Sequence, residues 1–305
     1  MAWNFGNILD TIIPVLPEGH LALVHGDREI TWAEMGHRSN NLGRFMLENG
    51  ASIGDKVGFY MRNRPEYMET LAACFRARLT HVNVNYRYVA DEVHYIFDNS
   101  DAAVVVYGKE FRDNVEILRP RLPNVKLWIE VGDGANLPAD TYDYENLATS
   151  GEGENLDVAR EGGDLLFLYT GGTTGMPKGV MWEHDALRET QTMALRALGD
   201  VPETLDELKA HLQTNGPGEV YIPACPLMHG TGLFTAMAAM MNGGTIVTLE
   251  AASLDSNELW QTVERRGVQN IAIVGDAFAK PMLAALEENA GAYDLSSLVS
   301  MISSG

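Results

Sequence analysis

Short apolar runs alternate with segments of helical spacing along most of this chain, and this alternation restricts the folds that it can adopt. The predicted strands are residues 56–61, 81–84, 102–107, 125–131, 164–169, 245–249, 270–274 and 298–302. The predicted helices between them are residues 65–78, 91–99, 109–121, 232–241, 256–266 and 277–289. Regular alternation of this kind produces mainly parallel sheets with helices on both faces. We therefore expect an α/β protein whose lobes are layers of helices and mainly parallel strands.

Other local signals delimit a helix near the start of the chain and interrupt the alternation later. Thr31 and Glu34 have the spacing of a capping box, and Asn49-Gly50 supplies a stop signal. Two polar stretches, residues 132–160 and 199–218, are rich in glycine or acidic residues. Neither stretch shows the hydrophobic period of a strand or of a helix. We predict loops or insertions at both stretches and expect the second to separate two lobes.

The charge balance limits the ligands and partners of the chain. Its 305 residues carry 22 basic and 42 acidic side chains, which gives a net charge of −20. No overall basic field is available to attract nucleic acid or an anionic membrane. We therefore expect no nucleic-acid partner, and any phosphate group must be held by local donors.

Cysteine usage and the absence of targeting signals indicate a cytoplasmic protein. Cys74 and Cys225 are too few for a disulfide framework, which favours a reducing compartment. No basic segment precedes the apolar residues of the N-terminus, and no apolar stretch reaches the length of a membrane span. The longest candidate, residues 230–249, is interrupted by Asn242-Gly243-Gly244.

The sequence TGGTTGMPKG at residues 170–179 directly follows a predicted strand. Its glycines allow successive backbone N–H groups to turn toward one anion, and its threonine hydroxyls add donors or metal ligands. Lys178 adds a full positive charge. These features together predict a polyphosphate site in a chain that is otherwise strongly acidic. The residues expected to hold the phosphates are Thr170, Gly171, Gly172, Thr173, Thr174, Gly175 and Lys178.

This segment has two other interpretations. A Walker loop requires Gly-Lys-Ser/Thr at its end, whereas Lys178 lies between Pro177 and Gly179, so the usual kinase or GTPase loop is excluded. A surface loop without function is the other alternative. The length of the motif and its position after a strand favour phosphate binding over that alternative.

With this loop and several weaker blocks, nearly the whole chain resembles the adenylate-forming superfamily of acyl-CoA synthetases, peptide-synthetase adenylation domains and luciferases. The segment at 170–179 is similar to the phosphate-loop signature of that family, and weaker blocks occur in the family's order. Residues 31–35 (TWAEM) resemble "T-Y-x-E-L", and residues 76–85 (RARLTHVNVN) resemble "R-A-G-A-x-x-x-x-x-N". Residues 226–232 (PLMHGTG) resemble "P-L-F-H-x-x-G", and residues 302–305 (ISSG) resemble the start of "S-G-G-A-P".

The resemblance implies ATP-dependent activation of a carboxylic acid, fatty or otherwise lipid-like, to an acyl-adenylate and then to acyl-CoA. Thr170 would then bind Mg²⁺, and Lys178 would add charge beside the departing pyrophosphate. His229 would lie near the reacting carboxylate, and ATP and coenzyme A would be the co-substrates. By the same resemblance, Ser304 and Gly305 would contact the adenine side of the nucleotide.

The acyl pocket is predicted at the ends of two later strands. The pocket residues implied by the resemblance and by strand-end positions are His229, Gly230, Leu233, Val274, Gly275 and Asp276. Gly275-Asp276 departs from the family's usual Val-Pro, and a buried Asp276 carboxylate would need a partner. Leu233 stands where some fatty acyl members have an aromatic gate. A single histidine such as His229 also has a structural interpretation, and no ligand cluster accompanies it and Cys225 that would favour zinc.

The family's later blocks, including its second magnesium ligand and the small C-terminal domain with its adenylation lysine, have no counterpart here. We therefore expect an incomplete N-terminal AMP-binding domain, a truncated form that is catalytically incompetent alone. The family's discontinuous subdomains imply one lobe at about residues 52–200 and another at 1–51 plus 220–305, with 201–219 as an insertion or loop.

Two other functions remain open on the sequence. One is an adenylating ligase that delivers to a carrier-protein thiol or activates an amino acid. PLMH at residues 226–229 favours acyl substrates, because amino-acid-activating members use an acidic residue in that block. The other is a non-catalytic nucleotide-binding module. Acyl chain length and a homodimeric state are left undetermined.

Overall fold

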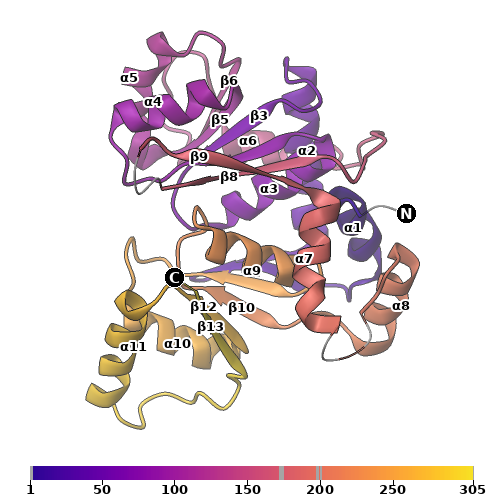
Figure 1. Cartoon of the computed structure of the whole chain (residues 1–305), viewed down its shortest axis with the longest axis vertical. Helices are drawn as coiled ribbons and strands as arrows, with labels where there is room; N and C mark the ends of the chain where they lie inside the picture. The colour runs from indigo at the N-terminus through magenta and orange to yellow at the C-terminus, as the bar shows by residue number, and fades with distance from the viewer. Residues whose placement is uncertain (1–2, 172–174, 197–198, 200, 305) are drawn as a thin grey trace. The chain divides into compact units, whose positions relative to one another are not determined.

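The computed structural model describes residues 3–171, 175–196, 199 and 201–304. The chain divides into two compact units (Figure 1). The first consists of Met1–Thr11, Glu34–Arg62 and Glu66–Leu208, and the second of Ile12–Ala33, Asn63–Pro65 and Lys209–Gly305. Each unit contains its own sheet, so each is described by itself. The α/β class and the mainly parallel sheets predicted from the alternation are confirmed.

The described part of the first unit contains a seven-stranded sheet in the order β7-β6-β5-β3-β4-β8-β9. Neighbouring strands are parallel, except that the edge strand β9 pairs antiparallel with β8. The central strands are buried over their whole length, as expected for a sheet covered on both faces. The bounds are β3 (Lys56–Tyr60), β4 (Thr80–Asn83), β5 (Ala102–Gly108), β6 (Leu127–Val131), β7 (Thr141–Asp143), β8 (Leu165–Thr170) and β9 (Lys178–Glu183).

Helices cover both faces of this sheet. One face packs against α4 (Ala90–Asn99) and α5 (Arg112–Leu118), whose buried residues form one core cluster with Tyr60 and Tyr107. Successive strand residues point to opposite faces, so Phe59 lies on the other face, where its ring centroid is 5.0 Å from that of Tyr67 in α3 (Pro65–Ala77). The remaining helices of this unit are α1 (Phe5–Ile12), α2 (Trp32–Glu48), α6 (Tyr144–Thr149) and α7 (His184–Arg196).

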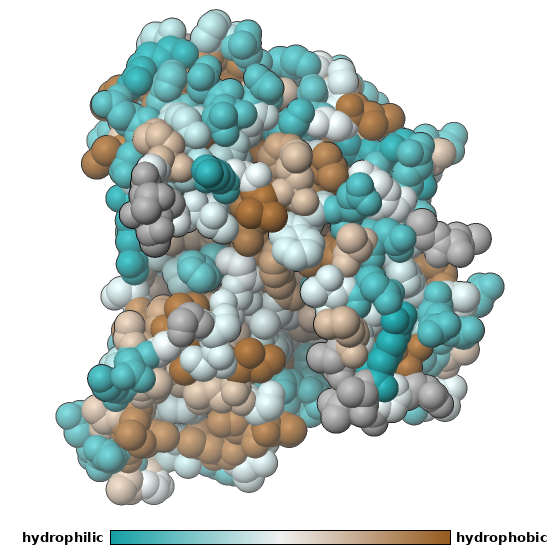
Figure 2. All heavy atoms as spheres, viewed as in Figure 1, coloured by the Kyte–Doolittle hydropathy of each residue, from teal (hydrophilic) through white to brown (hydrophobic). Residues whose placement is uncertain are grey.

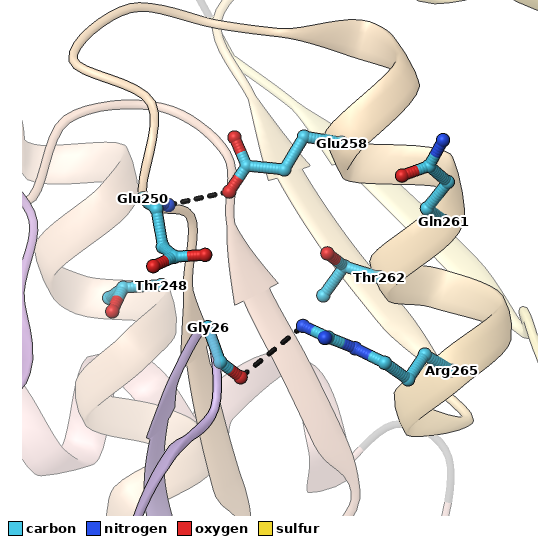
Figure 3. A pocket seen from close by; sticks show the side chains of 7 residues that line it. All are labelled: Gly26, Thr248, Glu250, Glu258, Gln261, Thr262 and Arg265. Atoms are coloured by element: carbon cyan, nitrogen blue, oxygen red, sulfur yellow. Dashed lines mark hydrogen bonds between the residues drawn. The ribbon is translucent and has the colours of Figure 1, made fainter.

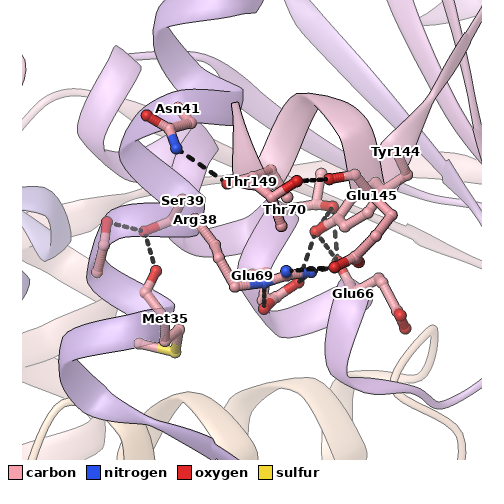
Figure 4. Close-up of polar contacts among 12 residues, drawn as sticks. Met35, Arg38, Ser39, Asn41, Glu66, Glu69, Thr70, Tyr144, Glu145 and Thr149 are labelled. Carbon is pink, nitrogen blue, oxygen red and sulfur yellow. Dashed lines mark hydrogen bonds and ion pairs between the residues drawn. The ribbon is translucent and has the colours of Figure 1, made fainter. Parts of the chain in front are cut away.

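A buried ionic network joins α2, α3 and α6 (Figure 4). Arg38 of α2 donates through Nε to Glu69 of α3 at 2.5 Å and through Nη1 to Glu145 of α6 at 2.8 Å. The hydroxyl of Tyr144 donates to the second oxygen of Glu69 at 3.0 Å. Burial alone would lower the pKa of Arg38, but its bonds to the two carboxylates outweigh that effect and raise the pKa above its ordinary value. The arginine therefore stays charged and holds three helices together.

The second unit contains, among its described residues, a six-stranded sheet in the order β13-β12-β10-β11-β1-β2. All neighbours are parallel except the β1–β2 hairpin. One face packs on α10 (Ser256–Arg266) and α11 (Asp276–Glu288), and Tyr221, Cys225 and Ala272 form a separate cluster with α9 (Gly230–Met240). The bounds are β1 (Leu21–His25), β2 (Arg28–Thr31), β10 (Val220–Pro223), β11 (Thr245–Thr248), β12 (Asn270–Ile273) and β13 (Ser300–Ser303).

Several predicted loops prove to be structured. The stretch 132–160 contains β7 and α6, so the prediction of a loop there was wrong in part. The stretch 199–218 contains α8 (Leu205–Asn215), whose Leu208 and Leu212 are buried at helical spacing. The β1–β2 hairpin, with Gly26-Asp27 at its turn, was not predicted. The predicted helix 109–121 is α5 flanked by the short 3-10 turns Lys109–Phe111 and Arg119–Arg121.

The division into units also differs from the predicted lobes. Helix α2 belongs to the first unit because Arg38 bonds to α3 and α6, whereas the sequence analysis assigned residues 1–51 to the second lobe. The boundary between the units falls within α8.

On the second unit, Figure 2 shows apolar residues over the part formed by α11 and β13. The exposed apolar side chains of this part are Leu283, Val299, Met301 and Ile302.

Candidate active site

The predicted phosphate loop connects the ends of β8 and β9. Thr170, the last residue of β8, pairs in register with Lys178, the first residue of β9, so the hairpin brings the two ends of the loop together. Both side chains are exposed. A side chain added at Gly171 or Gly175 would meet no other atom within 4 Å, so the space around these backbone positions is open. Gly172, Thr173 and Thr174 lie outside the described residues.

The strand before the loop is tied to its neighbour by a side-chain amide. Asn83, at the end of β4, donates through Nδ2 to the carbonyl of Tyr169 at 3.0 Å and accepts through Oδ1 from the Tyr169 N–H at 2.6 Å. Asn83 is buried, as is Tyr169. These two bonds fix the backbone of the residue that immediately precedes Thr170.

Gly179, on the other side of the loop, is required for close packing. A Cβ atom at this position would lie 2.9 Å from the ring of Tyr169, its partner across the antiparallel pair. That contact is too short for real Cβ atoms, so only glycine lets the ring lie over β9. Burial raises the pKa of Tyr169 to about 12, and its hydroxyl therefore remains protonated near neutral pH.

The segment that carries His229 is held by an asparagine that the sequence analysis missed. Asn63 donates through Nδ2 to the carbonyls of Pro223 and Cys225, and its Oδ1 accepts from Leu227 N at 2.7 Å. In the sequence, Asn63 lies two residues after the predicted strand 56–61, and this position at a strand end is the signal that could have indicated it. His229 itself is exposed and is the N-cap of α9, without a side-chain capping bond.

Gly232 explains part of the motif at 226–232. A Cβ atom there would lie 2.4 Å from the carbonyl oxygen of Pro226, so glycine permits the first turn of α9 to pack directly on the preceding segment. Gly230, the first residue of α9, is partly exposed. Leu233 is fully buried in this structure. It therefore contributes to the packing of α9 rather than to an open surface.

Three of the predicted sites meet at one edge of the second unit's sheet. The segments that follow β10, β12 and β13 lie at the same edge because these strands are parallel neighbours. The Ser304 hydroxyl lies 2.5 Å from the hydroxyl of Thr231 in α9, and Gly275 N donates to Ser303 Oγ at 3.2 Å. His229, Gly275 and Ser304 thus belong to one strand-end cluster, the usual place for ligands in open α/β sheets. Gly305 lies outside the described residues.

The two residues around Gly275 behave differently. Val274 is half-buried and contacts the cluster of Tyr221, Cys225 and Ala272. Asp276 begins α11 with a largely exposed side chain that pairs with Lys280 at 2.9 Å, four residues along the helix. The Asp276 carboxylate is therefore not buried, and Lys280 is its partner at the surface. Gly275 adopts φ 61° and ψ −164°, a conformation that is essentially restricted to glycine.

A cluster of cations and aromatic rings lies at the corresponding edge of the first unit's sheet. The guanidinium carbon of Arg62 lies 5.3 Å from the ring centroid of Tyr86 and 6.0 Å from that of Phe111. Arg87 lies 5.8 Å from the Tyr86 ring. These residues follow β3, β4 and β5, so they gather where three parallel strands end.

The described part of the chain also contains two buried thiols and a polar cavity. Burial raises the pKa of the Cys225 thiol to about 12 and that of the Cys74 thiol further, so neither is a thiolate near neutral pH. A polar cavity of about 190 Å³ in the second unit is lined by residues that include Glu250, Glu258 and Arg265 (Figure 3). Where residues are described, no group of three or more His, Cys, Asp and Glu side chains has the geometry of a metal site.

The fold agrees with the comparisons. The model of the AMP-binding enzyme family matches residues 15–305, and the chain belongs to this family. It is 35% identical over 311 residues to the 3-oxocholest-4-en-26-oate–CoA ligase of Rhodococcus rhodochrous, covering 100% of this chain and 56% of that protein. It is 34% identical to a medium/long-chain-fatty-acid–CoA/3-oxocholest-4-en-26-oate–CoA ligase of Mycobacterium marinum, covering 98% and 55%.

A solved fatty acyl CoA synthetase of Mycobacterium tuberculosis has the same fold, with a TM-score of 0.79 and 22% identity over 99% of this chain and 55% of that one. The chain therefore spans about half the length of the curated relatives that it matches. No helix in the described segments combines the length and the apolar character needed to cross a bilayer.

Proposed function

We propose that the protein uses ATP to activate a carboxylic acid and transfers the acyl group to the thiol of coenzyme A. A carboxylate cannot be attacked directly by a thiol, because oxide is too poor a leaving group. In the first step a carboxylate oxygen attacks the α-phosphate and pyrophosphate leaves. In the second step the thiol sulfur attacks the acyl carbon and AMP leaves. The observation that carries this proposal is the glycine- and threonine-rich segment between β8 and β9, bounded by the paired residues Thr170 and Lys178, in a member of the AMP-binding enzyme family.

The loop supplies the donors that the first step requires. Repulsion between a carboxylate and a polyphosphate must be screened by cations and by oriented N–H groups. The backbone at Gly171 and Gly175 and the exposed Lys178 fit a polyphosphate, since no atom of the described residues lies within 4 Å of a Cβ position at either glycine. Thr170 is the hydroxyl proposed to bind Mg²⁺, which would neutralise phosphate charge when bound. Gly172, Thr173 and Thr174 are included in the proposed site on sequence alone.

The second unit's strand-end cluster is the proposed acyl and adenine side. His229 is exposed at the start of α9, so it is available to a substrate carboxylate. Gly275 and Ser304, joined to their neighbours by the bonds around Ser303 and Thr231, are proposed to border the same ligands. The names of the relatives support a lipid-like acid, either a medium- or long-chain fatty acid or the side-chain acid of a steroid.

The cation and aromatic cluster is the proposed contact for the nucleotide end of coenzyme A. That part of the molecule carries phosphate groups and an adenine ring. Arg62 and Arg87 provide positive charge, and the partly exposed ring of Tyr86 provides a face for stacking. In a chain of net charge −20, these two cationic groups beside an aromatic ring favour an anionic ligand.

Because the 305-residue chain is expected to be catalytically incompetent alone, the test is acid-dependent exchange of pyrophosphate into ATP by a protein of its relatives' length that contains these residues, followed by assay of acyl-CoA formation. The acids are octanoate, palmitate and 3-oxocholest-4-en-26-oate, and the reference variant is Lys178→Ala. Mg-ATP binding by the 305-residue chain is measured in parallel by calorimetry. Exchange that requires one of these acids supports the proposal. Exchange without formation of acyl-CoA supports a carrier-protein acceptor instead, and nucleotide binding without exchange supports a binding module.

A further inference from the structure

Helix α4 forms hydrogen bonds to both ends of the phosphate loop. The Tyr169 hydroxyl donates to Oδ1 of Asn99 at 2.8 Å, and Tyr169 immediately precedes Thr170. The Tyr95 hydroxyl donates to the carbonyl oxygen of Pro177 at 3.2 Å, and Pro177 immediately precedes Lys178. Tyr95 and Asn99 are four residues apart in the helix, so they lie on one face of α4.

The helix that makes these bonds is itself firmly seated. Val93, Ile96 and Phe97 of α4 are almost completely buried in the core cluster of the first unit. The ring of Phe97 lies directly over Gly58 of β3, where an added Cβ atom would come within 2.3 Å of it. Because α4 has no room to move toward the sheet, its polar face presents Tyr95 and Asn99 at fixed positions.

A glycine-rich loop that binds phosphate benefits from hydrogen bonds that other elements make to its ends. Its residues have more backbone freedom than others, and ordering them on a ligand costs about 1–2 kcal/mol per residue. Donors that are already aimed at the charge bind it without this cost. In this protein the Asn83 amide holds Tyr169 from β4, and α4 holds Tyr169 and Pro177 from the face of the sheet.

We propose that Tyr95 and Asn99 of α4 are positioning residues for ATP, which fix the backbone at the two ends of the phosphate loop against α4. This inference rests on the proposed nucleotide function. Neither residue is assigned a contact with ATP, because both act through Pro177 and Tyr169. Their loss should therefore weaken Mg-ATP binding while leaving the acid and thiol sites unchanged.

The test compares Tyr95→Phe and Asn99→Ala with the unaltered 305-residue chain. Each variant removes one side-chain hydrogen bond to an end of the loop. We expect Mg-ATP binding, measured by calorimetry well below the melting temperature, to weaken about two- to tenfold in each variant, the effect of one bond. Trypsin cleavage after Lys178 should also become faster, and Mg-ATP should protect that bond less well.

A matched control separates positioning from a general loss of stability. Tyr293 donates to Oδ1 of Asn257 at 2.9 Å in the second unit, the same Tyr–Asn bond that links Tyr169 to Asn99. The Tyr293 bond is more exposed, so Tyr293→Phe should lower the melting temperature by a smaller amount and leave Mg-ATP affinity unchanged. Tyr169→Phe combined with Asn99→Ala should bind Mg-ATP as weakly as either single variant, because both changes remove one bond.

The outcomes distinguish this inference from the proposed function. If the unaltered chain binds Mg-ATP and the Tyr95→Phe and Asn99→Ala variants bind it equally well, the positioning role is wrong and the proposed function stands. Equal weakening by Tyr293→Phe would also overturn the positioning role. If the unaltered chain binds no nucleotide, both the proposed function and this inference fail.

Discussion

Asn83 and Tyr169 are joined by a reciprocal pair of hydrogen bonds, in which the side-chain amide of one residue donates to and accepts from the backbone of the other. The regular pairing of β4 with β8 covers His81–Leu166 and Val82–Phe167. The side-chain amide of Asn83 thus adds two hydrogen bonds between β4 and β8 beyond the last paired residues. Tyr169 is the last residue before the loop that begins at Thr170, so this bond pair fixes the entrance to the proposed phosphate site.

Removing this amide should destabilise the first unit. Asn83→Ala leaves a buried N–H and a buried carbonyl of Tyr169 without their side-chain partner, at a cost of about 2–4 kcal/mol in the free energy of unfolding. Urea denaturation measures the change. Asn49→Ala, which removes an exposed amide bond to Phe45, is the control and should cost less than about 1 kcal/mol. Equal losses in the two variants would contradict the structural role of Asn83.

Gly179→Ala should disturb the ring of Tyr169. The new methyl group would lie 2.9 Å from that ring, and overpacking of this kind costs about 1–3 kcal/mol. We expect lower stability and weaker Mg-ATP binding. Gly163→Ala, at a site with no atom within 4 Å, should be nearly neutral. Adding Tyr169→Leu to Gly179→Ala should recover part of the lost stability, and strict additivity of the two losses would contradict the clash.

Lys178→Ala should weaken Mg-ATP binding by about tenfold or more, because a hydrogen bond to a charged group is worth about 1.5–3 kcal/mol. Lys178→Arg, which keeps the charge, should bind with intermediate affinity. Lys209→Ala removes an exposed lysine of α8 and should have no effect. Calorimetric titration with Mg-ATP at two salt concentrations measures these differences. An unchanged affinity in Lys178→Ala would remove the lysine from the proposed site.

Arg78 stands where the resembled family block has glycine, and the structure shows why that position is unusual. Its φ is 55°, in the left-handed region, and its guanidinium bonds to Asp164 at 2.9 Å and to the carbonyl of Ala159 at 2.8 Å. Both Arg78→Gly and Arg78→Ala lose these bonds, but only glycine relieves the backbone strain. We expect the glycine variant to be about 1 kcal/mol more stable than the alanine variant in urea denaturation, the reverse of the usual order.

Two buried histidines should make the protein sensitive to acid. Burial lowers the pKa of His184 to about 4 and that of His81 to about 3. The unfolded chain takes up these protons near pH 6.5, so the stability that neutral histidine provides is complete above that pH. It falls by up to about 1.4 kcal/mol per pH unit for each histidine as the pH drops toward the lowered pKa.

His184→Phe isolates one of these contributions. The His184 ring lies between Phe5 and Phe75, with centroid distances of 4.8 Å to each, so phenylalanine fits the same surroundings. The variant should lose stability between pH 6 and pH 4.5 less steeply than the unaltered chain, by about one proton. Urea denaturation across this range measures the slope. The same slope in both proteins would assign the acid sensitivity to other groups.

Local patterns in the sequence determined the class of fold and the position of the phosphate loop. The apolar runs of β4 and β5 and the helical spacing of α4 are visible in neighbouring residues of the sequence. The glycines and threonines of residues 170–179 are also close together in the sequence. Hydrophobic period and turn chemistry act over a few residues, so they can be recognised without the partners. The family blocks could be recognised for the same reason, because each is a short local segment and the blocks follow the order found in the family.

The tertiary structure decided which distant residues complete the site. Asn83 lies 86 residues from Tyr169, and Asn63 lies 164 residues from Leu227, which it holds in place. Strand order and register bring these pairs together, and neither is encoded in a local pattern. For the same reason no local pattern could show that α2 packs in the first unit. Local sequence patterns thus determine the secondary-structure elements and the loop. Packing between distant strands and helices determines which residues hold the loop in place.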